Sequence, residues 1–316
     1  MKTSTLAVST EDEAKDAILP SNAKAETPPD QTAGAGGSHG AEAAAGVRNA
    51  LFEDLVRFDW AGLASSWSTR LLSLAVGVAI WHVLCVNEFR FFINFENVPA
   101  PLVVLSSLIG HLQSSKFYIH VMVSIQRIMI GFALATCIGI CLGVIMGRSR
   151  IARDFVIPYI EILRPIPAVA WIPLAILMWP TEESSIIYIT FLGALFPIIL
   201  NTVHGVEQTP EVLVRAAQSL GASTLQIFWH VVMPAALPSI ATGLAIGMGV
   251  SWFSLLAGEI ISGQYGIGYF TWNAYSLINY PDIIVGMLVI GGLGTLSTQA
   301  VRTAMRPLLT WQRKSR

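Results

Sequence analysis

The sequence predicts an all-α polytopic membrane protein with about six transmembrane helices. Hydrophobic residues make up 53% of its 316 residues and charged residues only 12%, about half the charged share of soluble domains. Several apolar runs are about 20 residues long, enough to cross a bilayer as helices. Lys and Arg also gather in alternate connections between these runs, as they do in proteins that cross a membrane repeatedly.

Two segments precede the first apolar run. Residues 1–48 are rich in Ala, Gly, Ser, Pro and acidic residues. This composition buries too little apolar surface to offset the entropy of ordering, so we expect a disordered cytoplasmic tail. Residues 49–66 predict an amphipathic helix in the membrane interface, with a plain cytoplasmic linker helix as the alternative. Its apolar face comprises Leu51, Phe52, Leu55 and Phe58.

Six apolar segments follow within residues 67–304, and a basic cytoplasmic tail, 305–316, ends the chain. The segments lie near Leu71–Asn87, Ile128–Met146, Phe155–Trp179, Ser185–Val203, Ser239–Ile261 and Ile283–Val301. The third segment should be broken or kinked because prolines lack a backbone donor. Its prolines are Pro158, Pro165, Pro167 and Pro173.

Glycines recur at every fourth position of two segments, as Gly139, Gly143 and Gly147 in the second and as Gly243 and Gly247 in the fifth. Such stripes let helix backbones approach closely. We therefore expect these two helices to pack against protein.

Flanking charges orient the segments. Three arginines crowd the link between the second and third segments, Arg215 lies between the fourth and fifth, and the basic tail follows the sixth. Apart from the long first loop, the opposite connections carry acidic residues and no Lys or Arg. Since basic loops mark the cytoplasm, we expect both termini to be cytoplasmic. The three arginines are Arg148, Arg150 and Arg153.

Residues 204–238, between the fourth and fifth segments, predict two helices joined by a turn. Thr209 and Pro210 form a helix start, and the first helix should run to about Leu220. Gly221 suits a left-handed position after a helix, and Ser223 can cap the second helix. Pro234 and Pro238 should mark the entry into the fifth segment.

The small side chains of Ala216 and Ala217 give the first helix of this loop a surface that fits a groove on another protein. The alternative is a helical pair that only packs on its own membrane domain. Helix signals alone leave the two interpretations open.

The spacing of this loop resembles the EAA loop of type I ATP-binding-cassette (ABC) importer permeases. The matching residues are Ala216, Ala217, Gly221, Val231, Met233 and Pro234. Val231 and Met233 replace Ile and Leu of that pattern, whereas Arg215 replaces its Glu and reverses a charge. Four further stretches resemble the nitrate/sulfonate/taurine subfamily, so the resemblance covers about residues 117–304. They are Ser124–Phe132, Arg164–Ala175, Leu192–Gly205 and Gly258–Ile261.

The resemblance implies the type I ABC importer permease fold and a permease subunit of an ATP-driven importer in the bacterial inner membrane. Two copies would line a pathway for a small anion such as nitrate, bicarbonate, taurine or an alkanesulfonate. Separate ATPase subunits, which bind ATP and Mg, would dock on the cytoplasmic loop 204–238, and an extracytoplasmic binding protein would deliver substrate. The chain itself has no phosphate-binding GxxxxGK[ST] loop,.

Charged and aromatic residues of the apolar segments are candidates for the pathway, because charges inside a membrane are costly and mark functional sites. Glu161 and Arg164 lie three apart, so they either pair with each other or leave Arg164 to attract an anion. Glu259 either gates the pathway, meets the docking protein, or accepts a hydrogen bond from a loop amide. The remaining candidates are Pro165, Pro167 and Trp171.

Gly263, Gly266 and Gly268 form a GxxGxG pattern followed by aromatic residues. We interpret it as an outer loop that either meets a binding protein or packs on the mouth of the pathway.

Two other functions of the chain stay open: a secondary transporter without an ATPase, and a non-transporting scaffold or sensor. The scattered histidines have no metal-ligand spacing, and we expect no cofactor in this chain and no nucleic-acid partner.

Overall fold

The computed structural model of the protein describes residues 60–87 and 97–309. The expected tail 1–48, most of the expected interfacial helix 49–66, and residues 310–316 lie outside these ranges. The chain divides into two units, Met1–Thr69 and Arg70–Arg316, and the architecture described below is that of the second unit. Every regular element in the described ranges is a helix, as the composition predicts.

Five of the described helices are long and apolar enough to cross a membrane, and a bent pair of shorter helices brings the number to six if the pair forms one span. This confirms the expected number of about six. The second span begins 13 residues before its expected start, because α4 begins at Ser115 and not at Ile128. The five helices are α2 (Trp60–Val86), α4 (Ser115–Arg148), α7 (Glu182–Glu207), α10 (Met233–Ser262) and α12 (Tyr280–Met305).

The third apolar segment is the bent pair. It comprises α5 (Arg150–Leu163), the short 3-10 helix η1 (Ala168–Trp171) and α6 (Ile172–Met178), and the chain turns by 89° at the break. Two of its prolines, Pro165 and Pro167, lie within the break, where they remove two backbone donors that a continuous helix would need. The break predicted from the prolines is confirmed.

Helix α7 is the centre of the bundle and packs along both α4 and α10. Glycines make both contacts close. A Cβ atom on Gly143 of α4 would lie 2.5 Å from the Cβ of Thr202, and one on Gly247 of α10 would lie 3.0 Å from a side-chain carbon of Ile198. The expectation that the glycine stripes pack against protein is confirmed, and their partner in both cases is α7.

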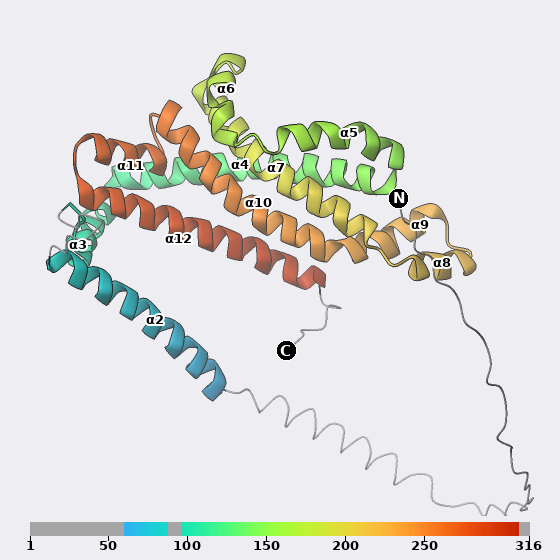
Figure 1. The fold of residues 1–316 in the computed structure, drawn as a ribbon, viewed down its shortest axis with the longest axis horizontal. Coiled ribbons are helices and arrows are strands. Elements are labelled where there is room, and N and C mark those ends of the chain that lie inside the picture. The colour runs from blue at the N-terminus through green and yellow to red at the C-terminus, as the bar shows by residue number, and fades with distance from the viewer. Residues whose placement is uncertain (1–59, 88–96, 310–316) are drawn as a thin grey trace, which may run out of the picture. The chain divides into compact units, whose positions relative to one another are not determined.

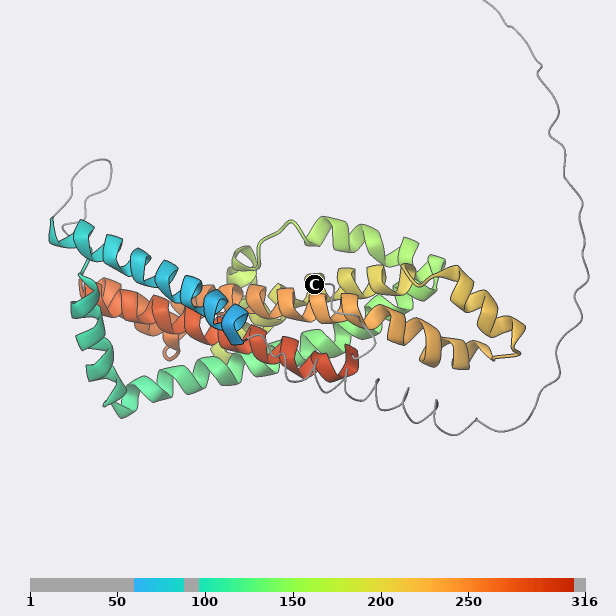
Figure 2. The ribbon, with the colours of Figure 1, turned by 90° about the horizontal axis from the view of Figure 1, so that it is seen from below.

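Short helices lie at the two ends of this bundle (Figures 1 and 2). Helices α3 (Pro101–Leu112) and α11 (Ile267–Ser276) lie at one end, here called the α11 end. Helices α8 (Glu211–Ser219) and α9 (Thr224–Ile227) lie at the other, the α8 end. The sequence predicted the second pair but not the first.

The loop 204–238 differs from expectation at two points. Pro210, not Thr209, is the N-cap residue of α8, and no side chain caps this helix. The second helix is also not separate from the fifth span: a π-helical turn, η2 (Phe228–Val232), connects α9 to α10, and Pro234 and Pro238 lie within α10. Pro234 occupies the first turn of α10, where no backbone donor is needed,, and spans tolerate an internal proline such as Pro238.

Candidate functional site

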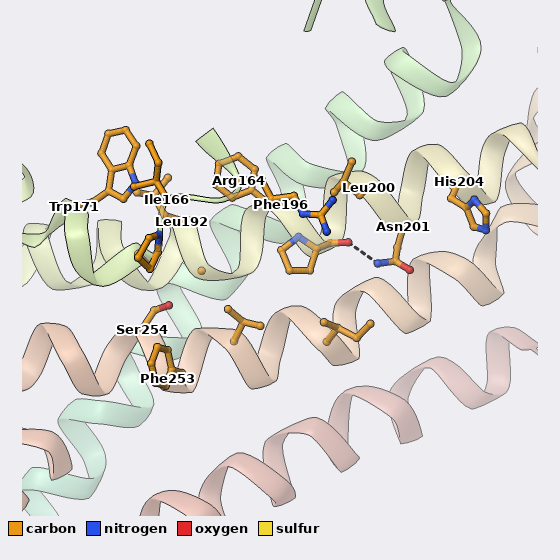
Figure 3. A pocket seen from close by; sticks show the side chains of 16 residues that line it. Arg164, Ile166, Trp171, Leu192, Phe196, Leu200, Asn201, His204, Phe253 and Ser254 are labelled. Atoms are coloured by element: carbon orange, nitrogen blue, oxygen red, sulfur yellow. Dashed lines mark hydrogen bonds between the residues drawn. The ribbon is translucent and has the colours of Figure 1, made fainter. Parts of the chain in front are cut away.

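A cavity of about 720 Å³ lies between α7, α10 and the bend that joins α5 to α6. We call it the central cavity. The bend contributes Arg164, Pro167 and Trp171, which are three of the pathway candidates predicted from the sequence. Figure 3 shows Trp171 near one end of the cavity and His204 near the other.

One face of α7 forms the second wall. Its lining residues recur every three or four positions, as on one side of a helix, and they are Leu192, Gly193, Phe196, Pro197, Leu200, Asn201 and His204. The side-chain amide of Asn201 donates to the carbonyl of Pro197 at 2.8 Å, drawn as a dashed line in Figure 3. One N–H of that amide therefore remains for another acceptor.

Helix α10 forms the third wall with Ile246, Val250, Phe253 and Ser254. The first three are large apolar side chains that stay exposed in the single chain. Ser254 is fully buried, and its hydroxyl has no hydrogen-bond partner within the described residues. It faces Gly193, where even a methyl group would collide with the Ser254 Oγ. The wall thus combines an apolar surface with one unused hydroxyl.

Arg164 is the one charged residue of this lining, which contains no carboxylate. It follows the last residue of α5, and its backbone N–H bonds to the carbonyl of Ile160 at 2.8 Å. A guanidinium in a largely apolar cavity favours anions with planar oxygen groups. Within the described ranges, neither Arg164 nor Glu161 takes part in an ion pair, so the proposed pairing of these two residues is not present.

The candidate pathway residues thus fall into two groups. Arg164, Pro167 and Trp171 line the central cavity, whereas Glu161 and Pro165 are exposed near the same bend but outside its lining. Glu259 lies elsewhere, in a buried ionic cluster of α10.

The buried cluster is centred on Arg127 of α4 and Glu259 of α10, whose side chains are 3% and 1% exposed. Their Nη1 and Oε1 atoms are 3.0 Å apart. Arg127 also donates from Nε to Glu183 of α7 at 2.8 Å and from Nη1 to the carbonyl of Tyr265 at 2.6 Å. Ser124 donates to Glu259 at 2.7 Å. The cluster therefore ties three spans to the loop before α11.

The same cluster holds the start of α11. Three consecutive backbone amides at this helix start donate to side chains of α4 and α10, which satisfies donors that a helix N-terminus leaves free. The pairs are Gly266 with His120 at 3.1 Å, Ile267 with Ser124 at 2.9 Å, and Gly268 with Glu259 at 2.9 Å. Of the three roles considered for Glu259, the geometry matches the acceptor for a loop amide.

Helix α8 projects at the α8 end and has no buried residue. Gly221 follows it with φ of +79°, the left-handed conformation that its position predicts,. Ser223 caps α9 through a reciprocal pair of hydrogen bonds with Gln226,, which confirms its expected role. The turn between the two helices is thus fixed by local chemistry.

Of the residues that match or replace the EAA pattern, some are exposed and others pack against the core. Arg215, Ala216 and Gly221 are exposed, whereas Ala217, Val231 and Met233 pack against the core formed by α7 and α10. Pro234 lies half-buried in the first turn of α10. Ala217 therefore faces the membrane domain. The outward surface of α8 combines Ala216, the charged pair Glu211 and Arg215, and exposed apolar residues. These are Val212, Leu213 and, just after the helix, Leu220.

Arg215 pairs with Glu211 one turn earlier on α8, with Nη2 and Oε2 2.6 Å apart. Both side chains are largely exposed, so the pair contributes little to stability. Its guanidinium remains accessible to a partner.

Sequence reasoning missed Asn201, His204 and Ser254 as lining residues. The first two could have been found, because they continue the three- and four-residue spacing of Phe196, Pro197 and Leu200 on one helix face. Ser254 gives no such signal, since a single serine in an apolar span is common.

The model of the family of binding-protein-dependent transport system inner membrane components matches residues 139–310, more than half of the chain. The protein belongs to this family. It is the membrane-spanning permease subunit of an ABC importer, a multi-pass protein of the inner membrane, and ATP hydrolysis belongs to a separate subunit. This assignment replaces the secondary transporter and the scaffold that the sequence left open.

Curated relatives agree with the family and with the nitrate/sulfonate/taurine subfamily. The nitrate import permease protein NrtB of Synechocystis is 33% identical and covers 71% of this chain and 83% of its own length. The taurine transport system permease protein TauC of Escherichia coli is 33% identical over 76% and 88%. The bicarbonate transport system permease protein CmpB of Synechococcus elongatus is 37% identical over 59% and 67%.

Family membership also implies the general assembly. Permeases of this family work as dimers with ATPase subunits and a substrate-binding protein.

Proposed function

We propose that two copies of this permease line a pathway for a small oxyanion, and that ATPase subunits drive it through α8. The observation that carries the proposal is the exposure of α8 and of its apolar side chains. This nine-residue helix has no fully buried residue, carries exposed apolar side chains and is followed by a left-handed glycine. An isolated apolar surface of this kind marks an interaction site.

The α8 end is proposed to be cytoplasmic, with both termini on the same side. A cavity at this end is lined by Arg148, Arg150 and Arg153 from the α4–α5 junction together with Glu211 and Arg215 of α8. Arginines of short connections mark the cytoplasmic side. The α11 end then faces outward, where the substrate-binding protein docks.

A second copy of the chain is proposed to close the central cavity. In the single chain Ile246, Val250 and Phe253 leave an apolar stripe of α10 open beside the cavity. Apposition of the same stripe from a two-fold related copy would enclose a pathway between them.

The proposed substrate is a small molecule with an anionic oxygen group. The relatives are named for nitrate, taurine and bicarbonate, which share such a group. In this chain Arg164 supplies a cation, Asn201 supplies a hydrogen-bond donor, and no carboxylate lines the central cavity. A cavity of this composition favours anions over cations.

The coupling role is tested by Gly221→Val and Gly221→Asn. A β-branched residue in the left-handed conformation costs about 1–2 kcal/mol, whereas Asn tolerates it. We expect Gly221→Val to insert into the membrane normally, to copurify with less ATPase subunit and to lose most ATP-dependent uptake. Gly221→Asn should retain uptake. The readouts are copurified ATPase and uptake of nitrate, bicarbonate or taurine into proteoliposomes.

Gly110→Val is the matched control, because Gly110 also has open space around it but lacks a positive φ. It lies in α3 at the α11 end, away from α8, so it should retain ATPase docking. Normal docking and uptake by Gly221→Val would refute the coupling role. Uptake of none of the three anions by the wild-type complex would refute the proposed substrate class.

A further inference from the structure

A second cavity, of about 650 Å³, adjoins the central cavity toward the α8 end. Asn201, His204 and Ile246 belong to the walls of both. The two cavities therefore form one groove along α7 and α10. The far wall of the second cavity comes from the end of α12 and from η3 (Arg306–Leu309), which contribute Arg302 and Arg306.

The groove has cations at both ends and no acidic residue. Arg164 lines the central cavity, Arg302 and Arg306 line the second, and no carboxylate lines either. Within the described ranges, none of these three arginines forms an ion pair. In contrast, Arg153 pairs with Glu207 and Arg215 pairs with Glu211 in the neighbouring cavity at the α8 end. The three arginines therefore keep their full positive potential toward the groove.

Polar groups between Arg164 and the two arginines of the second cavity can form hydrogen bonds with an anion that moves along the groove. The exposed imidazole of His204 and the remaining N–H of Asn201 lie where the two cavities meet. Arg302 and Arg306 are exposed to solvent, so each attracts an anion weakly. Several weak sites in series allow a charged substrate both to enter and to leave.

We propose that Arg302 and Arg306 form a release subsite for the transported oxyanion, reached from Arg164 past His204. This inference rests on the proposed function, because it takes the α8 end as cytoplasmic and an anion as the cargo. Arg302 and Arg306 are then specificity-determining residues of the pathway. They draw the anion toward the cytoplasm and repel cations that would enter from that side.

The test is uptake of nitrate, bicarbonate and taurine by the reconstituted complex of permease, ATPase and binding protein. Reversing both charges, in Arg302→Glu/Arg306→Glu, should lower the initial rate of anion uptake about tenfold or more, the scale on which electrostatic steering acts. Binding-protein-stimulated ATP hydrolysis should stay within about twofold of wild type, because α8 is untouched. The charge-conserving Arg302→Lys/Arg306→Lys should retain uptake.

Asp154→Lys is the remote control. Asp154 is an exposed charged residue of α5 that lies outside the linings of the described cavities, so its reversal should leave uptake unchanged. Wild-type uptake by the double Glu variant would overturn the release subsite alone. If the wild-type complex takes up none of the three anions, the proposed substrate class fails and the subsite fails with it.

In case the double Glu variant does not fold, a second measurement attaches a charge to position 302 after the complex has assembled. Arg302→Cys is made in a background that lacks Cys85, Cys137 and Cys141, and the assembled complex is treated with a methanethiosulfonate. A reagent that adds a positive charge should restore uptake, and one that adds a negative charge should not. Equal uptake with both reagents would contradict the proposal.

A lipid phosphate is the other anion that two arginines at a helix end can attract. The uptake comparison is therefore repeated in vesicles of phosphatidylcholine alone, which contain no anionic lipid. A difference between wild type and double Glu variant that persists there identifies the transported anion as the ligand. A difference that disappears would assign the arginines to anionic lipid and overturn the proposal.

Discussion

Arg127 and Glu259 form the most deeply buried charge pair of the described residues, and their burial makes each dependent on the other. Removing a charge from water costs several kcal/mol, which only a well-placed partner offsets. Arg127 has a second partner, Glu183, but that carboxylate is 57% exposed. Water can therefore take the place of the Glu183 carboxylate beside Arg127. In the buried position of Glu259, no other group can neutralise the charge of Arg127.

The two partners of Arg127 allow a matched comparison. Glu259→Gln leaves Arg127 without its buried counter-charge, so it should lower the free energy of unfolding by about 3–5 kcal/mol. Glu183→Gln should cost about 1 kcal/mol or less, because its side chain is mostly in water. Unfolding by SDS, followed by tryptophan fluorescence, measures both. Similar losses for the two variants would contradict the assigned roles.

The contacts within this cluster could not be predicted from the sequence. Arg127 and Glu183 each lie just before the expected start of a span, at Ile128 and Ser185, so hydropathy places both of them in loops. Their contact joins positions 56 apart in sequence, and the contact with Glu259 joins positions 132 apart. Hydropathy places charges relative to spans, but it does not say which spans meet. The burial of Arg127 therefore required the packing of α4, α7 and α10.

At the scale of elements, α7 is the helix on which the others depend, since it contacts both glycine stripes. Local signals predicted much of this architecture. The prolines predicted the break at Pro165 and Pro167, and the glycine pattern predicted close packing. Helices α3 and α11 were not predicted, because each is too short to span a membrane and neither is capped by a side-chain hydrogen bond. The start of α11 is fixed by Ser124 and Glu259, which lie outside it.

The packing of α4 on α7 predicts opposite effects for the same substitution at two glycines. Gly143→Ala places a methyl group 2.5 Å from the Cβ of Thr202 and 2.9 Å from the carbonyl oxygen of Ile199, so it should destabilise the protein by about 1–3 kcal/mol. Gly77→Ala in α2 meets nothing within 4 Å and should be neutral or stabilising by up to about 1 kcal/mol. Unfolding in SDS distinguishes the two.

Both variants add the same methyl group to a glycine within an apolar helix, so helix propensity and hydropathy change equally. A destabilisation shared by both would point to a general intolerance of the spans and not to the contact between α4 and α7. Stability of Gly143→Ala equal to that of wild type would show that the two helices can separate without loss.

At the scale of the whole molecule, the proposed function assigns different partners to the two ends of the bundle. In that proposal, ATPase movement enters at α8, the substrate-binding protein meets the α11 end, and the central cavity lies between them. An importer must expose such a cavity to one side at a time. The proposed role of the permease is then to transmit a movement of α8 through η2 and α10 to the cavity wall.

Alternating access predicts a specific pattern of chemical labelling. Ile246 lines the groove and is 47% exposed in the single chain, and Leu134 on α4 is 48% exposed but lines no described cavity. Each is replaced by Cys in a background without Cys85, Cys137 and Cys141. In inside-out vesicles a charged, membrane-impermeant thiol reagent should label Ile246→Cys and not Leu134→Cys, because water fills the groove whereas lipid covers α4.

The matched exposure of the two positions makes the comparison depend on their surroundings alone. Trapping the ATPases in their closed, nucleotide-bound state should protect Ile246→Cys from the reagent, since the groove then no longer opens toward the cytoplasm. Leu134→Cys should stay unreactive in both states. Equal labelling of the two cysteines, or labelling of Ile246→Cys that ignores the nucleotide, would show that the groove along α7 and α10 is not the path of the substrate.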